Sequence, residues 1–308
     1  MSTDRLAKLA AVLDGLMDRY RAHVPDVEGI VNEMVREGMI PDEHGLENDH
    51  IAFRTLGVPH LGIASLEQVF LHHGYQRRDR YDFPEKKLDA HWYAPPVERF
   101  PRIFISELRV RELTPEAQDI IHSYTDSVRE DPVRGLNLDD PREVVAFLHA
   151  PLWRRPTWTH YVRLRDESEY AAWVIHNRYY LNHFTIAVHN LPGGSDTVES
   201  FNRFLEAHGF TLNDSGGKVK TSPDGKLLQS STVAAMVDAE FDDGRGGTVR
   251  KRIPGSYVEF AERRVLDEFA HLPPHEVRRE HRREGFESAN ADRIFESTYT
   301  SQTGRRSP

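Results

Sequence analysis

Three residues of types that bind metals stand on strand-like segments of this 308-residue chain. His50 lies in DHIAFRT, His183 opens HFTIAV, and Glu259 lies in SYVEFAE. Strand side chains alternate between two faces, and each of these residues shares its face with small or polar neighbours while the other face is apolar. Two histidines and one carboxylate form the facial triad of Fe(II) sites. Such a triad leaves positions for a 2-oxo acid, bound through its carboxylate and keto oxygens, and for O2.

Arg54 and two further polar residues are candidate substrate contacts. Arg54 lies four residues after His50 on the same strand face, about 13 Å along the strand. Its long side chain can reach back over the metal, where a guanidinium holds a distal carboxylate through two hydrogen bonds. Gln229 and Ser231, in the strand-like run LLQSST, either hydrogen-bond the metal-bound carboxylate of the substrate or complete a polar sheet face. Tyr257 is expected beside Glu259 as a supporting hydrogen-bond donor.

Each of these residues, taken alone, has an ordinary explanation. The chain contains 17 histidines, and a single strand histidine is usually a half-buried structural side chain. His91, in DAHWY, and Glu107, in FISELRV, are rival ligands, and Glu107 is expected to occupy in the first half of the chain the place that Glu259 has in the second. An arginine such as Arg54 can also pair with a surface carboxylate, which contributes little. The joint pattern on three strands is what favours a metal site.

A weak internal repeat predicts the elements that position these residues. Each copy starts with a histidine-bearing strand, continues with a helix that ends in HGY or HGF, and closes with further strands. The glycine of this triplet, Gly74 or Gly209, follows the strand histidine by 24 or 26 residues. The matching offsets predict an α+β fold of two βαβββ repeats, curved around a polar cavity, with flanking and inserted helices. The expected division is N-terminal helices (1–41), first repeat (42–111), helical insert (112–180), second repeat (181–264) and C-terminal helices with a tail (265–308), together forming one catalytic unit.

The remaining segments give more local predictions. Asp26 is expected to cap the second helix. The run LLQSSTVAAMVDAEF is predicted to be strand in the second repeat, VLDEFAHL and EVRREHRRE to be helices, and the terminal TSQTGRRSP to be disordered. The glycine-rich runs NLPGGSD and NDSGGKVKTSPDGK are predicted to be turns rather than phosphate-binding loops.

Composition limits the class of protein and of site. The chain has no cysteine, which excludes disulfides and thiolate ligands and leaves His, Asp and Glu to bind a metal. The net charge of −9 argues against nucleic acid as a partner, and the absence of a long apolar run argues against a membrane. The first residues, MSTDRLAKLA, lack the apolar core of a secretory signal, so we predict a cytoplasmic protein. The oligomeric state is left open.

The segments DHIAFRT, SEYAAWVIHNRYYLNHFTIAV, LLQSST and YVEFAER together resemble the 2-oxoadipate dioxygenase/decarboxylase family, also called the 2-hydroxyglutarate synthase or DUF1338 family. The resemblance extends from about Asn48 to residue 298. It implies a partly open barrel of the vicinal-oxygen-chelate type, similar to hydroxymandelate synthase. It also implies Fe(II) bound by His50, His183 and Glu259, and a far substrate carboxylate held by Arg54.

The resemblance further implies the reaction. Such an enzyme uses O2 to convert a 2-oxo diacid, 2-oxoadipate, to 2-hydroxyglutarate and CO2, a reaction of lysine catabolism, and consumes no second organic substrate. Ala289 and Asn290 are the nearest matches to a C-terminal loop that approaches the substrate in the family. Two alternatives stay open: an O2-independent isomerase or lyase that uses another divalent metal on the same scaffold, and a small-molecule-binding protein without catalysis.

Overall fold

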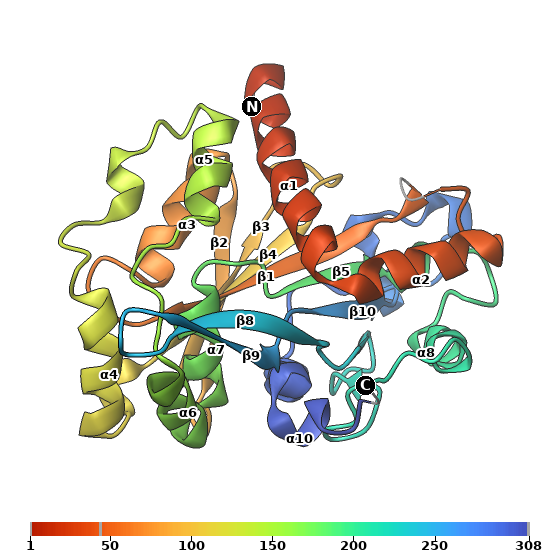
Figure 1. Ribbon diagram of the computed structural model, residues 1–308. Coiled ribbons are helices and arrows are strands. Elements are labelled where there is room, and N and C mark those ends of the chain that lie inside the picture. The colour runs from red at the N-terminus through yellow and green to blue at the C-terminus, as the bar shows by residue number, and fades with distance from the viewer. Residues whose placement is uncertain (1, 43–44, 307–308) are drawn as a thin grey trace. The chain divides into compact units, whose positions relative to one another are not determined.

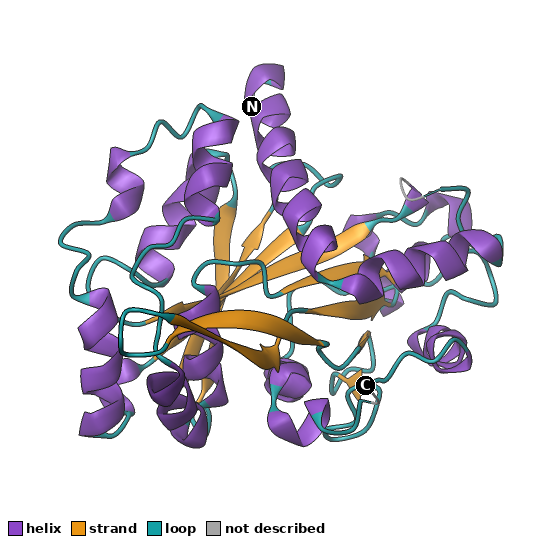
Figure 2. Ribbon diagram, in the orientation of Figure 1, coloured by secondary structure: helices purple, strands orange, loops and turns teal. Residues whose placement is uncertain are grey.

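The computed structural model describes residues 2–42 and 45–306. The chain forms two compact units that interleave along the sequence, residues 1–22, 52–182 and 236–254 in unit 1 and residues 23–51, 183–235 and 255–308 in unit 2. Both units combine helices with strands (Figures 1 and 2). The predicted α+β class is therefore confirmed.

Unit 1 contains most of the first repeat, from Ala52 on, and the helical insert. Strand β1 (Asn48–Leu56) begins in unit 2 and continues into unit 1, where the strand order is β2-β3-β4-β1 and β3 is antiparallel to β2 and β4. Helix α3 (Ile63–His72) packs its apolar face on the strand, since Phe70 lies 5.4 Å from Phe53 between ring centroids. The other elements are α1 (Thr3–His23), β2 (Gln76–Phe83), β3 (Leu88–Ala94), β4 (Arg102–Leu108), α4 (Pro115–Thr125), α5 (Pro141–Leu148), α6 (Trp158–Glu167), α7 (Glu169–Asn177), β8 (Met236–Asp242) and β9 (Thr248–Pro254).

Unit 2 contains the second repeat and the C-terminal region. Its strand order is β5-β10-β7-β6, with β10 parallel to β5 and antiparallel to β7. The apolar face of β10 packs under α8, since the rings of Phe260 and Phe201 lie 5.1 Å apart. The opposite face of β10 therefore carries Glu259, as strand parity predicts. The elements are α2 (Pro25–Arg36), β5 (His183–Ala187), α8 (Val198–Ala207), β6 (Lys220–Thr221), β7 (Leu227–Ser231), β10 (Tyr257–Arg263), α9 (Ser288–Ile294) and α10 (Thr300–Thr303).

The helices of the two repeats end in the same way. Gly74 and Gly209 have φ angles of 91° and 82°, in the left-handed region that glycine adopts at little cost. The residue after the glycine donates its backbone N–H to the carbonyl five residues earlier, over 3.1 Å in the first copy and 3.0 Å in the second. This is the hydrogen bond of a Schellman ending, and its presence in both copies explains the HGY and HGF triplets.

The predicted strand LLQSSTVAAMVDAEF is divided between two sheets. Its first part is β7 in unit 2, whereas its second part, β8, pairs with β9 in a separate hairpin of unit 1. Phe241 of this hairpin packs against Trp158 and Tyr161 of α6, with ring centroids 5.2 and 5.1 Å apart. These aromatic contacts come from residues about 80 positions earlier, so the local strand pattern could not reveal the division.

The end of the chain is ordered where disorder was predicted. The described part of TSQTGRRSP contains α10, and Gln302 and Thr303 are buried. Arg306 makes two hydrogen bonds of 2.6 Å to the carboxylate of Asp26, a bidentate charged pair. Asp26 is therefore occupied by a tertiary contact and does not cap α2, which begins after Val24.

The basic segment near residue 280 was predicted to be helical and is not. Arg283 donates to the Asp224 carboxylate over 3.0 Å, and Arg282 donates to the backbone carbonyl of Arg263 over 2.8 Å. These side chains make tertiary contacts with other parts of unit 2, and the backbone between them does not form a regular helix. Three short 3-10 turns form in place of the predicted helices: Asp267–Phe269, Pro274–Glu276 and Arg279–His281.

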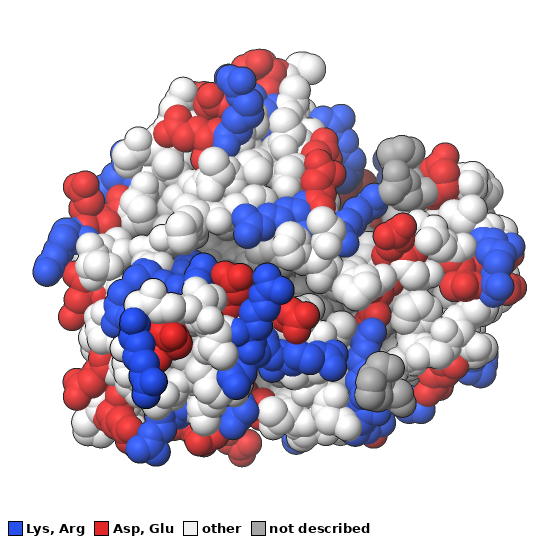
Figure 3. Space-filling model, in the orientation of Figure 1, with Lys and Arg blue, Asp and Glu red and all other residues white. Residues whose placement is uncertain are grey.

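The surface carries both signs of charge. On the face shown in Figure 3, Lys and Arg side chains are interspersed with Asp and Glu, in line with 40 basic and 49 acidic residues in the sequence. Within the described part of the chain, no helix combines the length and apolar character needed to cross a bilayer.

Candidate metal centre

The three predicted metal ligands lie together in unit 2. His50 is in β1, His183 opens β5 and Glu259 is in the middle of β10. In the parallel pairing of β5 and β10, Glu259 stands opposite Thr185 and Tyr257 opposite His183, which places His183 and Glu259 on one sheet face. The three side chains are buried, and among the described residues they form the group that can hold a metal ion.

The distances between the donor atoms fit one metal ion. The Nε2 atoms of His50 and His183 are 3.3 Å apart, and they lie 3.5 and 3.0 Å from the nearest carboxylate oxygens of Glu259. Metal–ligand bonds of about 2.1 Å at right angles would place neighbouring donors about 3.0 Å apart. The donor set and its spacing therefore fit a divalent metal of the Fe(II) facial-triad type.

Asp49 sets the orientation of the His50 ring. Its Oδ2 atom lies 2.9 Å from His50 Nδ1. A carboxylate only accepts hydrogen bonds, so Nδ1 carries the proton and the Nε2 lone pair faces the other two ligands. Thr185 Oγ1 lies 3.1 Å from the same Nε2 atom. This carboxylate–histidine arrangement is the one that supports metal-binding histidines in proteins.

Arg263 in turn fixes Asp49. Its Nε and Nη2 atoms donate to the two Asp49 oxygens over 2.7 and 2.9 Å, and both side chains are 1% exposed. Its Nη1 atom donates to the carbonyl of Gly285 over 2.7 Å. Sequence reasoning missed this pair, although two signals were present: Asp49 directly precedes His50, and Arg263 lies four residues after Glu259 on the same strand face.

The electrostatics of the site favour a cation. Burial alone raises the pKa of Glu259, but the charges of His50 and His183 and its hydrogen bonds to them outweigh this effect and hold that pKa well below its usual value. Burial alone lowers the pKa of His50, but Glu259 and Asp49 outweigh burial and raise it. The two buried carboxylates thus favour positive charge at the site, and a divalent metal would supply it in place of protons on the histidines.

Comparison with known proteins decides the family. The profile of the family described as 2-oxoadipate dioxygenase/decarboxylase matches residues 12–271. The chain belongs to the 2-oxoadipate dioxygenase/decarboxylase family. A relative from Arabidopsis thaliana, named "2-oxoadipate dioxygenase/decarboxylase, chloroplastic", is 43% identical over 288 residues, which are 90% of this chain and 74% of the relative. A relative from Oryza sativa subsp. japonica, with the same name and the location chloroplastic/amyloplastic, is 46% identical over 270 residues, 84% of this chain and 71% of the relative.

Solved structures agree with the family. The hydroxyglutarate synthase of Oryza sativa, crystallised in complex with 2-oxoadipate, is 40% identical in sequence. The structural match covers 99% of this chain and 96% of that protein, with a TM-score of 0.88. A glyoxalase-superfamily protein from Ralstonia eutropha JMP134 is 21% identical over 89% of this chain and 83% of its own, with a TM-score of 0.69. The second likeness concerns the fold alone, and it agrees with the predicted α+β fold.

The names of the relatives contradict the predicted cytoplasmic location. Both curated relatives are described as plastid proteins. The prediction rested on the absence of an apolar secretory core, and this test does not address the amphipathic, Arg- and Ser-rich sequences that direct proteins to chloroplasts.

Arg54 of this 2-oxoadipate dioxygenase/decarboxylase family member is buried in unit 1. It is 1% exposed, and its guanidinium carbon lies 5.1 Å from the ring centroid of Tyr170 and 5.3 Å from that of Trp173. The hydroxyl of Tyr170 accepts a hydrogen bond from the backbone N–H of Thr55 and lies 2.8 Å from the hydroxyl of Ser106. The strands of unit 1 therefore hold the Tyr170 ring in place beside the guanidinium of Arg54.

The other predicted substrate contacts have different surroundings. Gln229 donates to Glu259 Oε1 over 2.6 Å, and Asn290 donates to Gln229 over 3.0 Å. Ser231 lies 2.8 Å from the hydroxyl of Ser297, at the C-terminal end of unit 2. Ala289 is exposed on α9, and the Tyr257 ring packs against His183 with centroids 4.8 Å apart.

The rival ligands belong to unit 1, and Glu107 has a structural role there. Its Oε2 accepts the backbone N–H of Ile63, the first residue of α3, over 2.8 Å. In the second repeat, Glu262 accepts the N–H of Val198, the first residue of α8, over 2.9 Å. Glu107 therefore corresponds to Glu262 and not, as expected, to Glu259. His91, on β3, is half-buried, and burial lowers its pKa.

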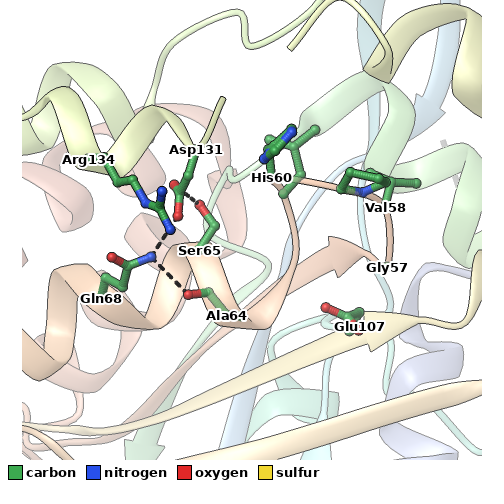
Figure 4. Close-up of a pocket in the computed structure, with 11 residues that line it drawn as sticks. Gly57, Val58, His60, Ala64, Ser65, Gln68, Glu107, Asp131 and Arg134 are labelled. Atoms are coloured by element: carbon green, nitrogen blue, oxygen red, sulfur yellow. Dashed lines mark hydrogen bonds between the residues drawn. The ribbon is translucent and has the colours of Figure 1, made fainter. Parts of the chain in front are cut away.

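Glu107 also lines a pocket of about 460 Å³ within unit 1 (Figure 4). Ser65 and Gln68 of α3 line it too, and both donate hydrogen bonds of 2.7 Å to Asp131. Gly62, which precedes α3, has a φ of 110°, and a side chain there would overlap the Glu107 carboxylate. The strand carboxylate thus replaces the side-chain cap that this helix lacks.

Replacing Asp49 with asparagine should weaken both the fold and the metal site. Arg263 would remain buried without its charged partner, which lowers the free energy of unfolding by about 3–5 kcal/mol. The single acceptor oxygen of asparagine cannot serve both Arg263 and His50, so the weaker support of His50 should weaken Mn(II) binding by about 10- to 100-fold. Urea denaturation and metal titration measure the two effects. Asp82→Asn, which removes the exposed partner of Arg109, is the control and should change neither. Unchanged metal affinity in Asp49→Asn would contradict the orienting role.

Replacing Glu107 with alanine should destabilise unit 1 and spare the metal site. The first N–H group of α3 would lose its acceptor, which lowers the free energy of unfolding by about 1–2 kcal/mol. Glu107→Gln keeps an acceptor oxygen and should recover most of this loss. Denaturation curves together with iron analysis test this structural role of Glu107. Loss of iron from both variants would instead show that Glu107 is a metal ligand.

Proposed function

We propose that this chain is an Fe(II)-dependent enzyme that converts 2-oxoadipate and O2 to 2-hydroxyglutarate and CO2. The observation that carries the proposal is the buried group of His50, His183 and Glu259, with donor atoms 3.0–3.5 Å apart, in a chain of this family. Its support includes the similar Oryza sativa protein crystallised with 2-oxoadipate.

His50 and Glu259 have the protonation states that a bound metal would require of its ligands. His50 presents Nε2 because its Nδ1–H group donates to Asp49, and Glu259 is ionised because its pKa is held low. When bound, Fe(II) supplies the redox chemistry through which O2 reacts with a 2-oxo acid. Three protein ligands leave room for a substrate that chelates through two oxygens. Burial of all three excludes water, which limits side reactions.

Arg54 is proposed to bind the carboxylate at the far end of the substrate. It lies on the same strand as His50, and its guanidinium is held in place by Tyr170 and Trp173. Binding of the far carboxylate would orient the carbon chain, so that the methylene next to the keto carbon is the one hydroxylated. A buried arginine suits a carboxylate because its planar fork makes two parallel hydrogen bonds.

The atoms of the reaction balance without a second organic substrate. One carboxylate leaves as CO2, the former keto carbon becomes a carboxylate, and the neighbouring methylene gains a hydroxyl group. One atom of O2 ends in the new carboxylate and the other in the hydroxyl. The substrate therefore supplies all the electrons that O2 takes up.

Oxygen uptake by the Fe(II)-loaded protein with 2-oxoadipate tests this proposal. We expect equal amounts of O2 consumed, CO2 released and 2-hydroxyglutarate formed, with both atoms of ¹⁸O2 in the organic product. Turnover of a different 2-oxo acid, with 2-oxoadipate inert, would retain the reaction and replace the substrate. Iron binding without O2 uptake for any 2-oxo acid would leave an O2-independent reaction on the same scaffold.

A further inference from the structure

Glu259 receives a hydrogen bond from an amide side chain on the neighbouring strand. Gln229, on β7, stands opposite Ala261 of β10, which is two residues from Glu259 on the same face. Its Nε2 donates to Glu259 Oε1 over 2.6 Å, and the two side chains are 2% and 1% exposed. Because a carboxylate offers no hydrogen, the NH2 end of the Gln229 amide must be the end that faces it.

A second amide holds the other end of Gln229. Asn290, in the first turn of α9, donates from Nδ2 to Gln229 Oε1 over 3.0 Å. The same group lies 3.2 and 3.3 Å from the backbone carbonyls of Lys220 and Leu227, on β6 and β7. Asn290 is therefore fixed by the backbone of two strands, and it fixes Gln229 in turn. Both ends of the Gln229 amide are engaged by the protein.

The nearby ammonium group of Lys220 does not replace Gln229. Lys220 pairs with Gln229 in the sheet register and is buried. Its Nζ donates to the backbone carbonyl of Asn213 over 2.7 Å, and burial lowers its pKa to about 8. The direct hydrogen bond that Glu259 receives from β7 thus comes from the neutral amide, which fixes direction without adding a charge to the site.

We propose that Gln229, held by Asn290, is a positioning residue that orients the Glu259 carboxylate for metal binding. The inference rests on the proposed metal centre. With Oε1 held by Gln229, Oε2 is the oxygen that lies 3.0 Å from His183 Nε2 and serves as the ligand atom. A carboxylate restrained in this way binds through one oxygen, which preserves the coordination positions that a chelating substrate and O2 need.

Metal titration of variants separates positioning from simple stabilisation. Gln229→Leu removes both hydrogen bonds at similar volume, and Asn290→Ala removes only the support. Ser230→Ala is the matched control, because Ser230 on the same strand donates to Asn202 over 2.7 Å and belongs to the other sheet face. Affinity for Mn(II) and the visible spectrum of bound Co(II) are measured for each protein, together with the melting temperature without metal.

We expect Gln229→Leu to bind Mn(II) about 10- to 100-fold more weakly and to change the Co(II) spectrum. Asn290→Ala should weaken binding less, and the double variant should be no weaker than Gln229→Leu alone, because Asn290 acts through Gln229. Ser230→Ala should lower only the melting temperature. Wild-type affinity and spectrum in Gln229→Leu, or additive losses in the double variant, would overturn the inference. Failure of the unmodified protein to bind any divalent metal would instead reject the proposed function.

Discussion

Replacing His183 with alanine is expected to remove the metal and the activity while leaving the fold intact. His183 Nε2 lies 3.0 Å from Glu259 Oε2 and 3.3 Å from His50 Nε2, so its loss takes away one of three ligands. Supporting residues already contribute 10- to 100-fold to metal affinity, and a ligand should contribute more than about 100-fold. Iron analysis after anaerobic loading and an O2-uptake assay measure both effects.

The control for this variant is His91→Ala, since His91 was the rival histidine. It should retain one iron per chain and its turnover, and circular dichroism should show both variants folded. Stoichiometric iron in His183→Ala would refute this ligand. Loss of iron from His91→Ala alone would move the metal site to unit 1.

The candidate ligands could be predicted because they depend on local geometry. In DHIAFRT, HFTIAV and YVEFAER the alternation of side chains has a period of two, so parity separates His50, His183 and Glu259 from the apolar face. The helix endings at Gly74 and Gly209 are local for the same reason, since a left-handed residue after a helix is a property of a few neighbouring positions.

The supporting contacts could not be predicted because they join distant residues. Asp49 and Arg263 are 214 positions apart, and Asp26 and Arg306 are 280 apart. Nothing in one short segment indicates such a partner. The error at Glu107 arose differently: Glu107 and Glu259 both lie on a late strand of their repeat, and that alone does not show which residues of the two strands correspond. Hydrogen bonds to the first helical N–H groups align it with Glu262.

Gln229 and Asn290 could be singled out from the sequence as polar residues near the site, but the side chains that they contact could not. A polar residue on the inner face of a strand can face a substrate or another side chain, and parity does not distinguish the two. In unit 2 the contacts described for Gln229 connect β7 to β10 and α9. The role of a residue beside a metal ligand can therefore be assigned only once the tertiary structure shows its contacts.

Replacing Arg54 with alanine should lower kcat/KM for 2-oxoadipate by about 30- to 4,000-fold, because truncating one partner of a buried charged pair costs roughly 2–5 kcal/mol. Iron content should be unchanged, since Arg54 is not among the ligands. Arg54→Lys keeps the charge but loses the planar fork and its stacking on Tyr170 and Trp173, so it should restore little.

The decisive comparison uses 2-oxohexanoate, which has the same keto acid but lacks the far carboxylate. If Arg54 binds that carboxylate, the unmodified enzyme should turn over 2-oxohexanoate poorly, and Arg54→Ala should scarcely worsen it, because substrate and variant remove the same interaction. An equal further loss with 2-oxohexanoate would show that Arg54 supports the packing of α7 on the strands instead. Such a result would leave the iron reaction in place and would assign the recognition of the far carboxylate to another residue.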